Sequence, residues 1–247
     1  MMFRKFFRVL AVFIVIYFVP SVLFSDDIKE ADKLYRQLDY KYALEIYEKI
    51  MRESPSLDVA QKIANCYRFI NNTEAAEIWY KKTLGYPEAT SDNYKFLAEA
   101  LKQNGKFEEA AANYKIWGDK NPSFASEANK QANICEVARN WTENPDIGAL
   151  VQNEIGLNSE NSDFSPVQFG SDILLISDRW QKEKKGEDIY GWTGNPYLKI
   201  YSATAVENQN GTTKWTDIKE LPFNSDNYSV GHPSVSKDGK KETLITK

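Results

Sequence analysis

The sequence is poor in the residues on which metal and nucleophile chemistry usually depends. Its 247 residues contain one histidine, His232, and two cysteines, Cys66 and Cys135. The Asp-x-Asp-x-Asp-Gly calcium loop, the Gly-x-Ser-x-Gly elbow, the phosphate loop and the CxxC pair are all missing. We therefore expect no catalytic residue, no metal and no cofactor, and we favour a structural place for His232 at the start of a strand.

The chain also carries no large excess of positive or of negative residues. The formal net charge is −4, which argues against a nucleic-acid footprint. Hydrophobic residues make up 42% of the chain and charged residues 27%, a balance typical of globular proteins and not of disordered ones.

The first 25 residues have the pattern of a secretory signal peptide. Basic residues between Arg4 and Arg8 precede an apolar run from Val9 to Phe18, and Pro20 breaks that run. Cleavage after Ser25 would release the mature chain. An uncleaved anchor whose apolar stretch reaches Phe24 is the alternative, because that length approaches what a bilayer requires.

The next segment, residues 26–144, repeats with a period of about 34. Small and large residues recur in four columns at spacings of 33 and 34, and within each repeat a small residue precedes a large one by three or four. Such offsets place each pair on one helical face and predict two antiparallel helices per repeat. The columns are Ala31/Ala64/Ala98, Leu34/Tyr67/Leu101, Ala43/Ala76/Ala110 and Tyr47/Tyr80/Tyr114.

This pattern resembles the tetratricopeptide repeat (TPR) in three units. Two departures are the missing early Trp and an Ala in place of the usual Gly. Ala132 and Cys135 continue the first two columns into a fourth helix, which we expect to cap the stack. Since Cys66 lies two repeats from Cys135, roughly 20 Å at usual helix spacings, we predict no disulfide between them.

After Pro145 the composition changes to short strands separated by turns rich in Gly, Ser, Asn and Asp. The sequence predicts a strand that ends near Pro166, an apolar strand Ile173–Ile176, and two more within 197–205 and 212–222. Segments 161–166 and 228–234 open two units about 67 residues apart. Aspartates at the turns are expected to cap them, and a calcium or catalytic role is the alternative.

The Ser-Asp-Arg strand end and the Ser-Lys-Asp-Gly-Lys turn resemble the WD40-like PD40 repeat of β-propellers. In combination with the TPR-like segment they resemble a Bacteroidota family of outer-membrane-associated proteins. These carry a signal, TPRs, a PD40 propeller and usually an OmpA-like domain, and they include PorE-type components of type IX secretion.

The resemblance implies an α + β multidomain chain. We expect an N-terminal all-α TPR solenoid over residues 26–144, followed by incomplete PD40-type β-propeller blades over residues 157–247. Because a propeller usually needs at least four blades, we expect a chain truncated before the OmpA-like domain. We also expect a loosely ordered remnant after Gly239, and apolar faces around Ile173 and Leu175 that promote self-association.

The expected function is a non-enzymatic scaffold for protein–protein interaction in the periplasm, associated with the outer membrane, in secretion or envelope organisation. The partner is a protein or peptide, not a nucleic acid, and the resemblance places its site on the concave TPR face. The alternatives are a glycan- or peptidoglycan-binding module, carried by aromatic residues between Trp180 and Trp215, and an accessory domain of a hydrolase. The expected partner-binding residues are Arg36, Asn65, Arg68, Lys95, Glu99 and Lys102.

Overall fold

The computed structural model describes residues 25–149, 151–180, 189–207, 213–236 and 242–246. The expected signal segment lies outside the described residues, except for Ser25. The chain divides into two compact units, one with residues up to Ile147 plus Gly191–Thr193, and one with Gly148–Tyr190 plus Gly194–Lys247. Helices fill the first unit and antiparallel strands the second, so the fold is mixed α + β as predicted.

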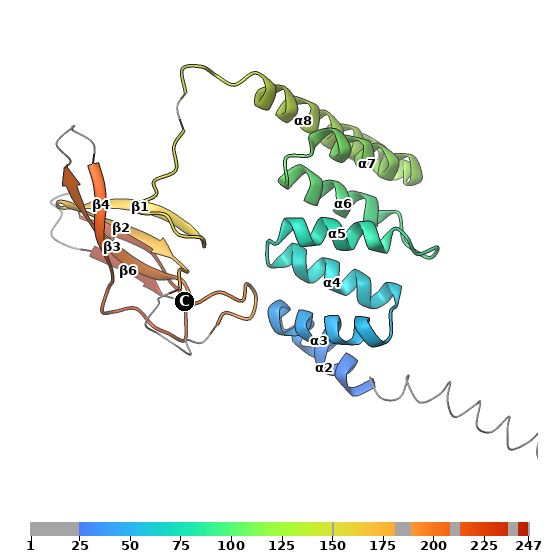
Figure 1. The fold of residues 1–247 in the computed structure, drawn as a ribbon, viewed down its shortest axis with the longest axis horizontal. Helices are drawn as coiled ribbons and strands as arrows, with labels where there is room; N and C mark the ends of the chain where they lie inside the picture. The colour runs from blue at the N-terminus through green and yellow to red at the C-terminus, as the bar shows by residue number, and fades with distance from the viewer. Residues whose placement is uncertain (1–24, 150, 181–188, 208–212, 237–241, 247) are drawn as a thin grey trace, which may run out of the picture. The chain divides into compact units, whose positions relative to one another are not determined.

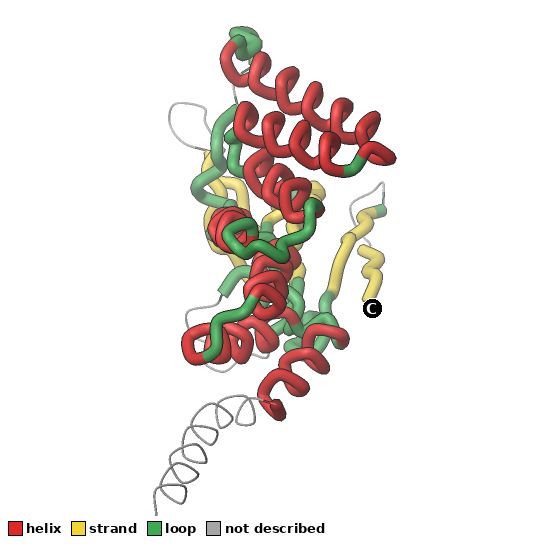
Figure 2. The backbone as a smooth tube through the Cα atoms, turned by 90° about the vertical axis from the view of Figure 1, so that its right-hand side faces the viewer, coloured by secondary structure: helices red, strands yellow, loops and turns green. Residues whose placement is uncertain are grey.

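The first unit contains seven α-helices within the described residues, and each helix packs against the next one in the chain (Figure 1). Figure 2 shows the same succession in a view turned by 90°. No helix between Ser25 and Glu143 is both long enough and apolar enough to cross a membrane. The helices are α2 (Ser25–Arg36), α3 (Tyr40–Glu53), α4 (Leu57–Phe69), α5 (Thr73–Thr83), α6 (Asp92–Gln103), α7 (Phe107–Lys120) and α8 (Ala125–Glu143).

The helix pairs α2/α3, α4/α5 and α6/α7 are joined by turns of the same kind. Leu38, Asn71 and Gly105 hold these turns with positive φ angles of 69°, 61° and 74°. Their spacing of 33 and 34 equals that of the small/aromatic columns. A left-handed residue is a common way to end a helix, because it lets later N–H groups reach the last carbonyls. The repeat is therefore present in the backbone as well as in the side chains.

The columns of small and aromatic residues form the core of this unit. Ala43, Ala76 and Ala110 lie in α3, α5 and α7 with at most 1% of their surface exposed, as the register predicts. Small side chains allow the helices to approach closely. Gly118 marks such a close approach, since an added Cβ there would lie 2.7 Å from the Cβ of Ala128 on α8.

Both cysteines are buried and unbridged. Burial raises the pKa of the Cys66 thiol to about 12, and burial also raises that of Cys135. The two side chains thus behave as small core residues.

The second unit contains a four-stranded antiparallel sheet in the order β1-β2-β3-β4 and a separate hairpin of β5 and β6. Leu174, Ile176 and Ile200 on one face of the sheet form an apolar cluster with Val230 of β5. On the other face, Leu175 clusters with residues that include Leu157. The strands are β1 (Asp163–Phe169), β2 (Asp172–Ser177), β3 (Lys199–Glu207), β4 (Thr213–Glu220), β5 (Val230–Val235) and β6 (Glu242–Thr246).

The first strand does not end near Pro166, as the sequence suggested, but continues to Phe169. The β1–β2 register shifts between Phe164 and Val167, and Ser165 within this bulge has a φ of 51°. A proline cannot donate a ladder hydrogen bond, but a bulge accommodates it. His232, 67 residues later, also has a φ of 51° and precedes a proline inside the corresponding bulge of β5. The two unit openings seen in the sequence therefore share one backbone geometry.

Two further expectations for this unit were wrong. Leu175 is 2% exposed, because Leu157 from the preceding loop covers its face of the sheet. Residues 242–246 do not lack a pairing partner, since β6 pairs with β5 from Thr246 opposite Val230 to Glu242 opposite Val235. The turn residues 237–241 lie outside the described residues.

Candidate functional site: the α6–α8 groove

Three of the six expected partner-binding residues line one groove in the helical unit. This α6–α8 groove has a volume of about 360 Å³. All six expected residues come from first helices of their repeats (α2, α4 and α6), and α6 and α8 are both first helices. It is lined by Lys95, Glu99, Lys102 and Gln103 of α6, Tyr114 and Trp117 of α7, and Glu127 and Gln131 of α8.

The two lysines of the groove lie over aromatic rings on its floor. The Lys95 ammonium is 5.3 Å from the centroid of the Trp117 ring, and the Lys102 ammonium is 5.6 Å from that of Tyr114. Such cation–π contacts hold a flexible lysine in place without neutralising its charge. Lys102 Nζ also donates to Gln131 Oε1 at 3.1 Å. The groove therefore presents two positioned cations, an amide and the carboxylates of Glu99 and Glu127.

Glu99 connects this groove to Arg68 of the preceding repeat. Its carboxylate lies 3.7 Å from the Arg68 guanidinium and 4.0 Å from the Lys95 ammonium. Arg68 lies flat between Phe69 and Phe96, with ring-centroid distances of 4.6 and 4.5 Å. Its Nε has no hydrogen-bond partner within the described residues. Three of the six expected residues thus form one charged row across α4 and α6, and Lys102 lines the same groove.

Asn65 is engaged within its own repeat. Tyr80 donates its hydroxyl hydrogen bond to Asn65 Oδ1 at 2.8 Å, and Tyr47 donates to Asp32 Oδ1 at 2.5 Å. In each case the tyrosine follows its acceptor by fifteen residues. Glu99 holds the equivalent position relative to Tyr114. In the first two repeats the buried tyrosine therefore ties the second helix to the polar side of the first.

Arg36 is exposed at the C-terminal end of α2, and the structure records no direct contact between it and the other five residues. It contributes to the electrostatics of Asp32. Burial would raise the pKa of the Asp32 carboxyl, but hydrogen bonds from Lys62 and Tyr47 and the charges of Lys62 and Arg36 hold it below its usual value.

Sequence reasoning missed the groove residues of α7 and α8. Tyr114 was assigned to the core, which is correct for its 1% exposure, but its ring also supports Lys102. Trp117 and Gln131 lay outside the four columns. For Trp117 the usable signal was its spacing, because it follows Tyr114 by three residues and thus shares its helical face.

The aspartates of the sheet unit serve as turn partners where the structure describes them. Asp178 is 5% exposed and accepts hydrogen bonds from the Ser162 N–H at 2.7 Å and from Asn195 Nδ2 at 2.9 Å. Burial opposes ionisation of Asp163, but hydrogen bonds from Ser159, Ser177 and Arg179 lower its pKa. This arrangement organises the end of β2.

His232 is exposed and lies edge-on to the Phe164 ring, with centroids 6.4 Å apart. Within the described residues, no group of three His, Cys, Asp or Glu side chains is placed to share a metal ion.

Three of the six aromatic residues considered for glycan stacking pack in apolar clusters, and Tyr190 and Tyr197 contact each other with ring centroids 5.6 Å apart. Tyr201 is 2% exposed, Trp215 packs against the same cluster as Tyr201, and Trp192 packs with the apolar cluster of the helical unit. Trp180 and Tyr190 are 51% and 40% exposed.

No protein-family model matches this chain, and no curated protein is significantly similar to it.

Proposed function

We propose that this chain is a non-enzymatic scaffold that holds a peptide segment of a partner protein in the α6–α8 groove. In this proposal the helical unit is a TPR solenoid, the sheet unit carries PD40-type propeller strands, and the protein works in the periplasm at the outer membrane. Its role there is in protein secretion, such as the type IX system, or in envelope organisation.

The observation that carries the proposal is the pair of positioned ammonium groups in a groove built by repeated helices. Lys95 and Lys102 are separated by nearly two helical turns of α6, about 10 Å along the helix axis. An extended peptide spans that distance with three to four residues. Carboxylates at two such positions would form charge-assisted hydrogen bonds with the lysines. The preferred ligand is therefore an extended segment with two acidic groups.

The backbone repeat supports the TPR assignment. The turn residues with positive φ recur at the same spacing as the alanine columns. So do the three polar residues that precede a buried tyrosine by fifteen positions. The paired proline bulges at Ser165 and His232 support two successive units of one kind in the sheet region.

The test is site-directed capture in the native cell. A photoreactive amino acid replaces Gln103, which is exposed at the groove, in the full chain. We expect a specific protein adduct that the double variant Lys95→Glu/Lys102→Glu abolishes. The matched control is Lys49→Glu/Lys115→Glu, because these lysines are about half exposed, lie outside the groove and pair with acidic residues. Adduct formation that both double variants reduce equally would contradict the groove as the binding site.

A second arm measures the chemistry directly. An array of acidic peptides with two carboxylates at varied separation is probed with the full chain at low and high salt. Binding should be strongest for a separation of three to four residues and should weaken as salt screens the charges. Equal binding to neutral and acidic peptides would contradict the proposed ligand class. The capture experiment would then be the test of the scaffold role.

A further inference from the structure

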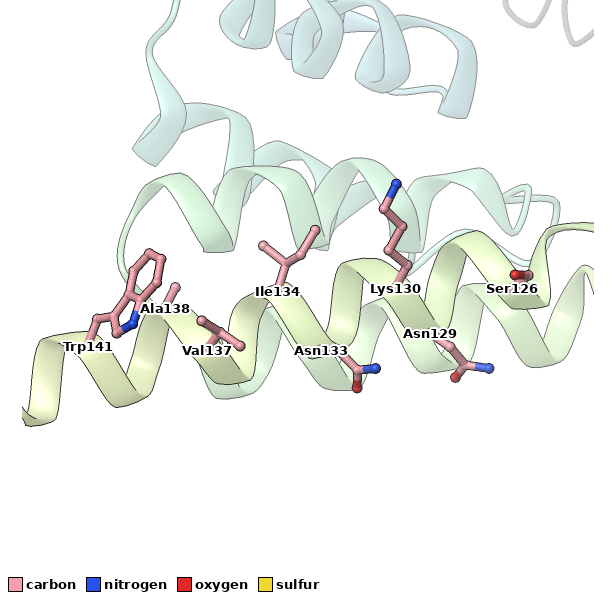
Figure 3. A pocket seen from close by; sticks show the side chains of 8 residues that line it. All are labelled: Ser126, Asn129, Lys130, Asn133, Ile134, Val137, Ala138 and Trp141. Atoms are coloured by element: carbon pink, nitrogen blue, oxygen red, sulfur yellow. The ribbon is translucent and has the colours of Figure 1, made fainter.

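The last helix of the stack carries an exposed seam made of residues other than those that line the α6–α8 groove. Ile134, Val137 and Trp141 are 41%, 49% and 71% exposed, and with Lys130 they follow one another at intervals of four, three and four residues. These four residues, the α8 seam, lie within a shallow groove of about 580 Å³ formed by α8 alone. In Figure 3, Lys130, Ile134 and Trp141 project from the same side of α8.

The spacing of the α8 seam is that of a helix that packs against another helix. Alternating intervals of three and four are the a/d pattern of a two-helix seam. The opposite side of α8 is already used, since Ala128, Ala132 and Cys135 are buried.

We propose that the α8 seam binds the α8 seam of a second copy of this chain, antiparallel and about a two-fold axis between Ile134 and Val137. In this arrangement Ile134 meets Val137 of the other copy twice, at the centre. Lys130 meets Trp141 of the other copy at both ends. A two-fold interface requires such self-complementarity.

Charge selects the antiparallel arrangement. Lys130 is the one charged residue of the seam, and a parallel pair would place the two Lys130 ammonium groups opposite each other. The antiparallel pair separates them by about 16 Å, eleven residues along the helix. It also places each ammonium over an indole ring. The same contact occurs twice within the chain, at 4.3 Å for Lys82 and Trp79 and at 5.3 Å for Lys95 and Trp117.

The dimer should be weak. Stable interfaces bury about 1,200–2,000 Å² in total, and one helix pair with four layers provides less. Association should therefore depend on concentration, and the test must trap the complex.

Disulfide trapping between two variants of the full chain, each with one added cysteine, tests the geometry. One variant carries Lys130→Cys and the other Trp141→Cys, each with a different tag. In the mixed antiparallel pair the new cysteines face each other at one end, while the native Lys130 and Trp141 remain paired at the other. After mild oxidation we expect a mixed dimer band about tenfold stronger than the band of either variant alone, because a disulfide needs Cα atoms about 6 Å apart. The native Cys66 and Cys135 are buried and present in every sample.

Two further substitutions separate the α8 seam from other surfaces. Val137→Glu, added to both trapping partners, buries two carboxylates at the centre and should lower the mixed band by about tenfold or more. Ile147→Glu is the matched control, because Ile147 is fully exposed and outside the seam. A missing mixed band, same-variant bands as strong as the mixed one, or a band that survives Val137→Glu would overturn the proposal. In the last case the association would belong to another surface, such as a strand edge of the sheet unit.

Discussion

Glu77 should make an unusually large contribution to the stability of the helical unit for a single carboxylate. Its side chain on α5 is 6% exposed and accepts four hydrogen bonds. Oε1 accepts from Lys81 Nζ at 2.7 Å and Lys106 Nζ at 2.8 Å, and Oε2 accepts from Asn104 Nδ2 at 2.7 Å and Lys106 Nζ at 3.0 Å. The carboxylate thereby fixes α5 to the turn between α6 and α7.

The magnitude follows from the pKa. Burial alone would raise the pKa of Glu77, but the hydrogen bonds from Lys106, Lys81 and Asn104 outweigh it and lower the pKa from 4.5 to about 2. At 1.36 kcal/mol per pH unit, this difference corresponds to about 3 kcal/mol of unfolding free energy at neutral pH. Because the folded-state pKa is depressed, the contribution is complete above pH 4.5 and is lost as the pH falls towards 2. By pH 3, about 2 kcal/mol of it should be gone.

The perturbation is Glu77→Gln, which keeps the shape and removes the charge. Both lysines are about half exposed and regain hydration, so we expect a loss of about 2 kcal/mol at pH 7. The assay is urea unfolding of the full chain, followed by circular dichroism at 222 nm, which reports on the helices. The control is Glu136→Gln, which breaks an exposed ion pair with Lys115 and should cost less than about 1 kcal/mol.

The pH dependence provides the decisive comparison. Other carboxylates also titrate in acid, but the difference between the original chain and Glu77→Gln isolates this one. That difference should shrink to a small fraction of its neutral value by pH 3. A difference below about 0.5 kcal/mol at pH 7, or one that stays constant down to pH 3, would refute the reasoning.

Three other outcomes are expected. Gly105→Ala should destabilise the chain by about 1 kcal/mol in the same urea assay, although nothing lies near the added Cβ, because its φ of 74° disfavours an L-residue. Gly118→Ala should cost about 1–3 kcal/mol through overpacking against α8, despite the higher helix propensity of alanine; an increase in stability would contradict the close approach. Cys66 and Cys135 should resist alkylation in the folded chain, because both are buried, and both should react after unfolding without a reductant; fewer than two reactive thiols would reveal a bridge.

The helical repeat could be predicted from the sequence because its signal is periodic. Four columns of small and aromatic residues fixed the helices, their pairing and their buried faces. The left-handed turns at Leu38, Asn71 and Gly105 were not predicted, since three different residue types occupy them and only one is glycine. When packing imposes a positive φ, several residue types can occupy the position, so the residue type alone does not predict it.

The sheet unit shows where local signals are insufficient. Pro166 suggested the end of a strand, but a bulge accommodates it, and its geometry depends on the partner strand. The burial of Leu175 depends on Leu157, eighteen residues away, and no local pattern specifies that contact. Likewise, the groove residues that the sequence predicted are all on α6, where they follow the repeat. The contributions of α7 and α8 come from tertiary packing.

The two proposed surfaces occupy different faces of α8, and this separation follows from the geometry of the helix. Gln131 and Lys130 are neighbours in sequence, but consecutive residues of an α-helix point about 100° apart. Gln131 therefore turns towards Lys102 in the groove, while Lys130 belongs to the α8 seam. Ala128, Ala132 and Cys135 lie on a third, buried face of α8. A second copy bound at the seam would use none of the residues that line the groove, and two grooves in one assembly would favour partners that present two acidic segments.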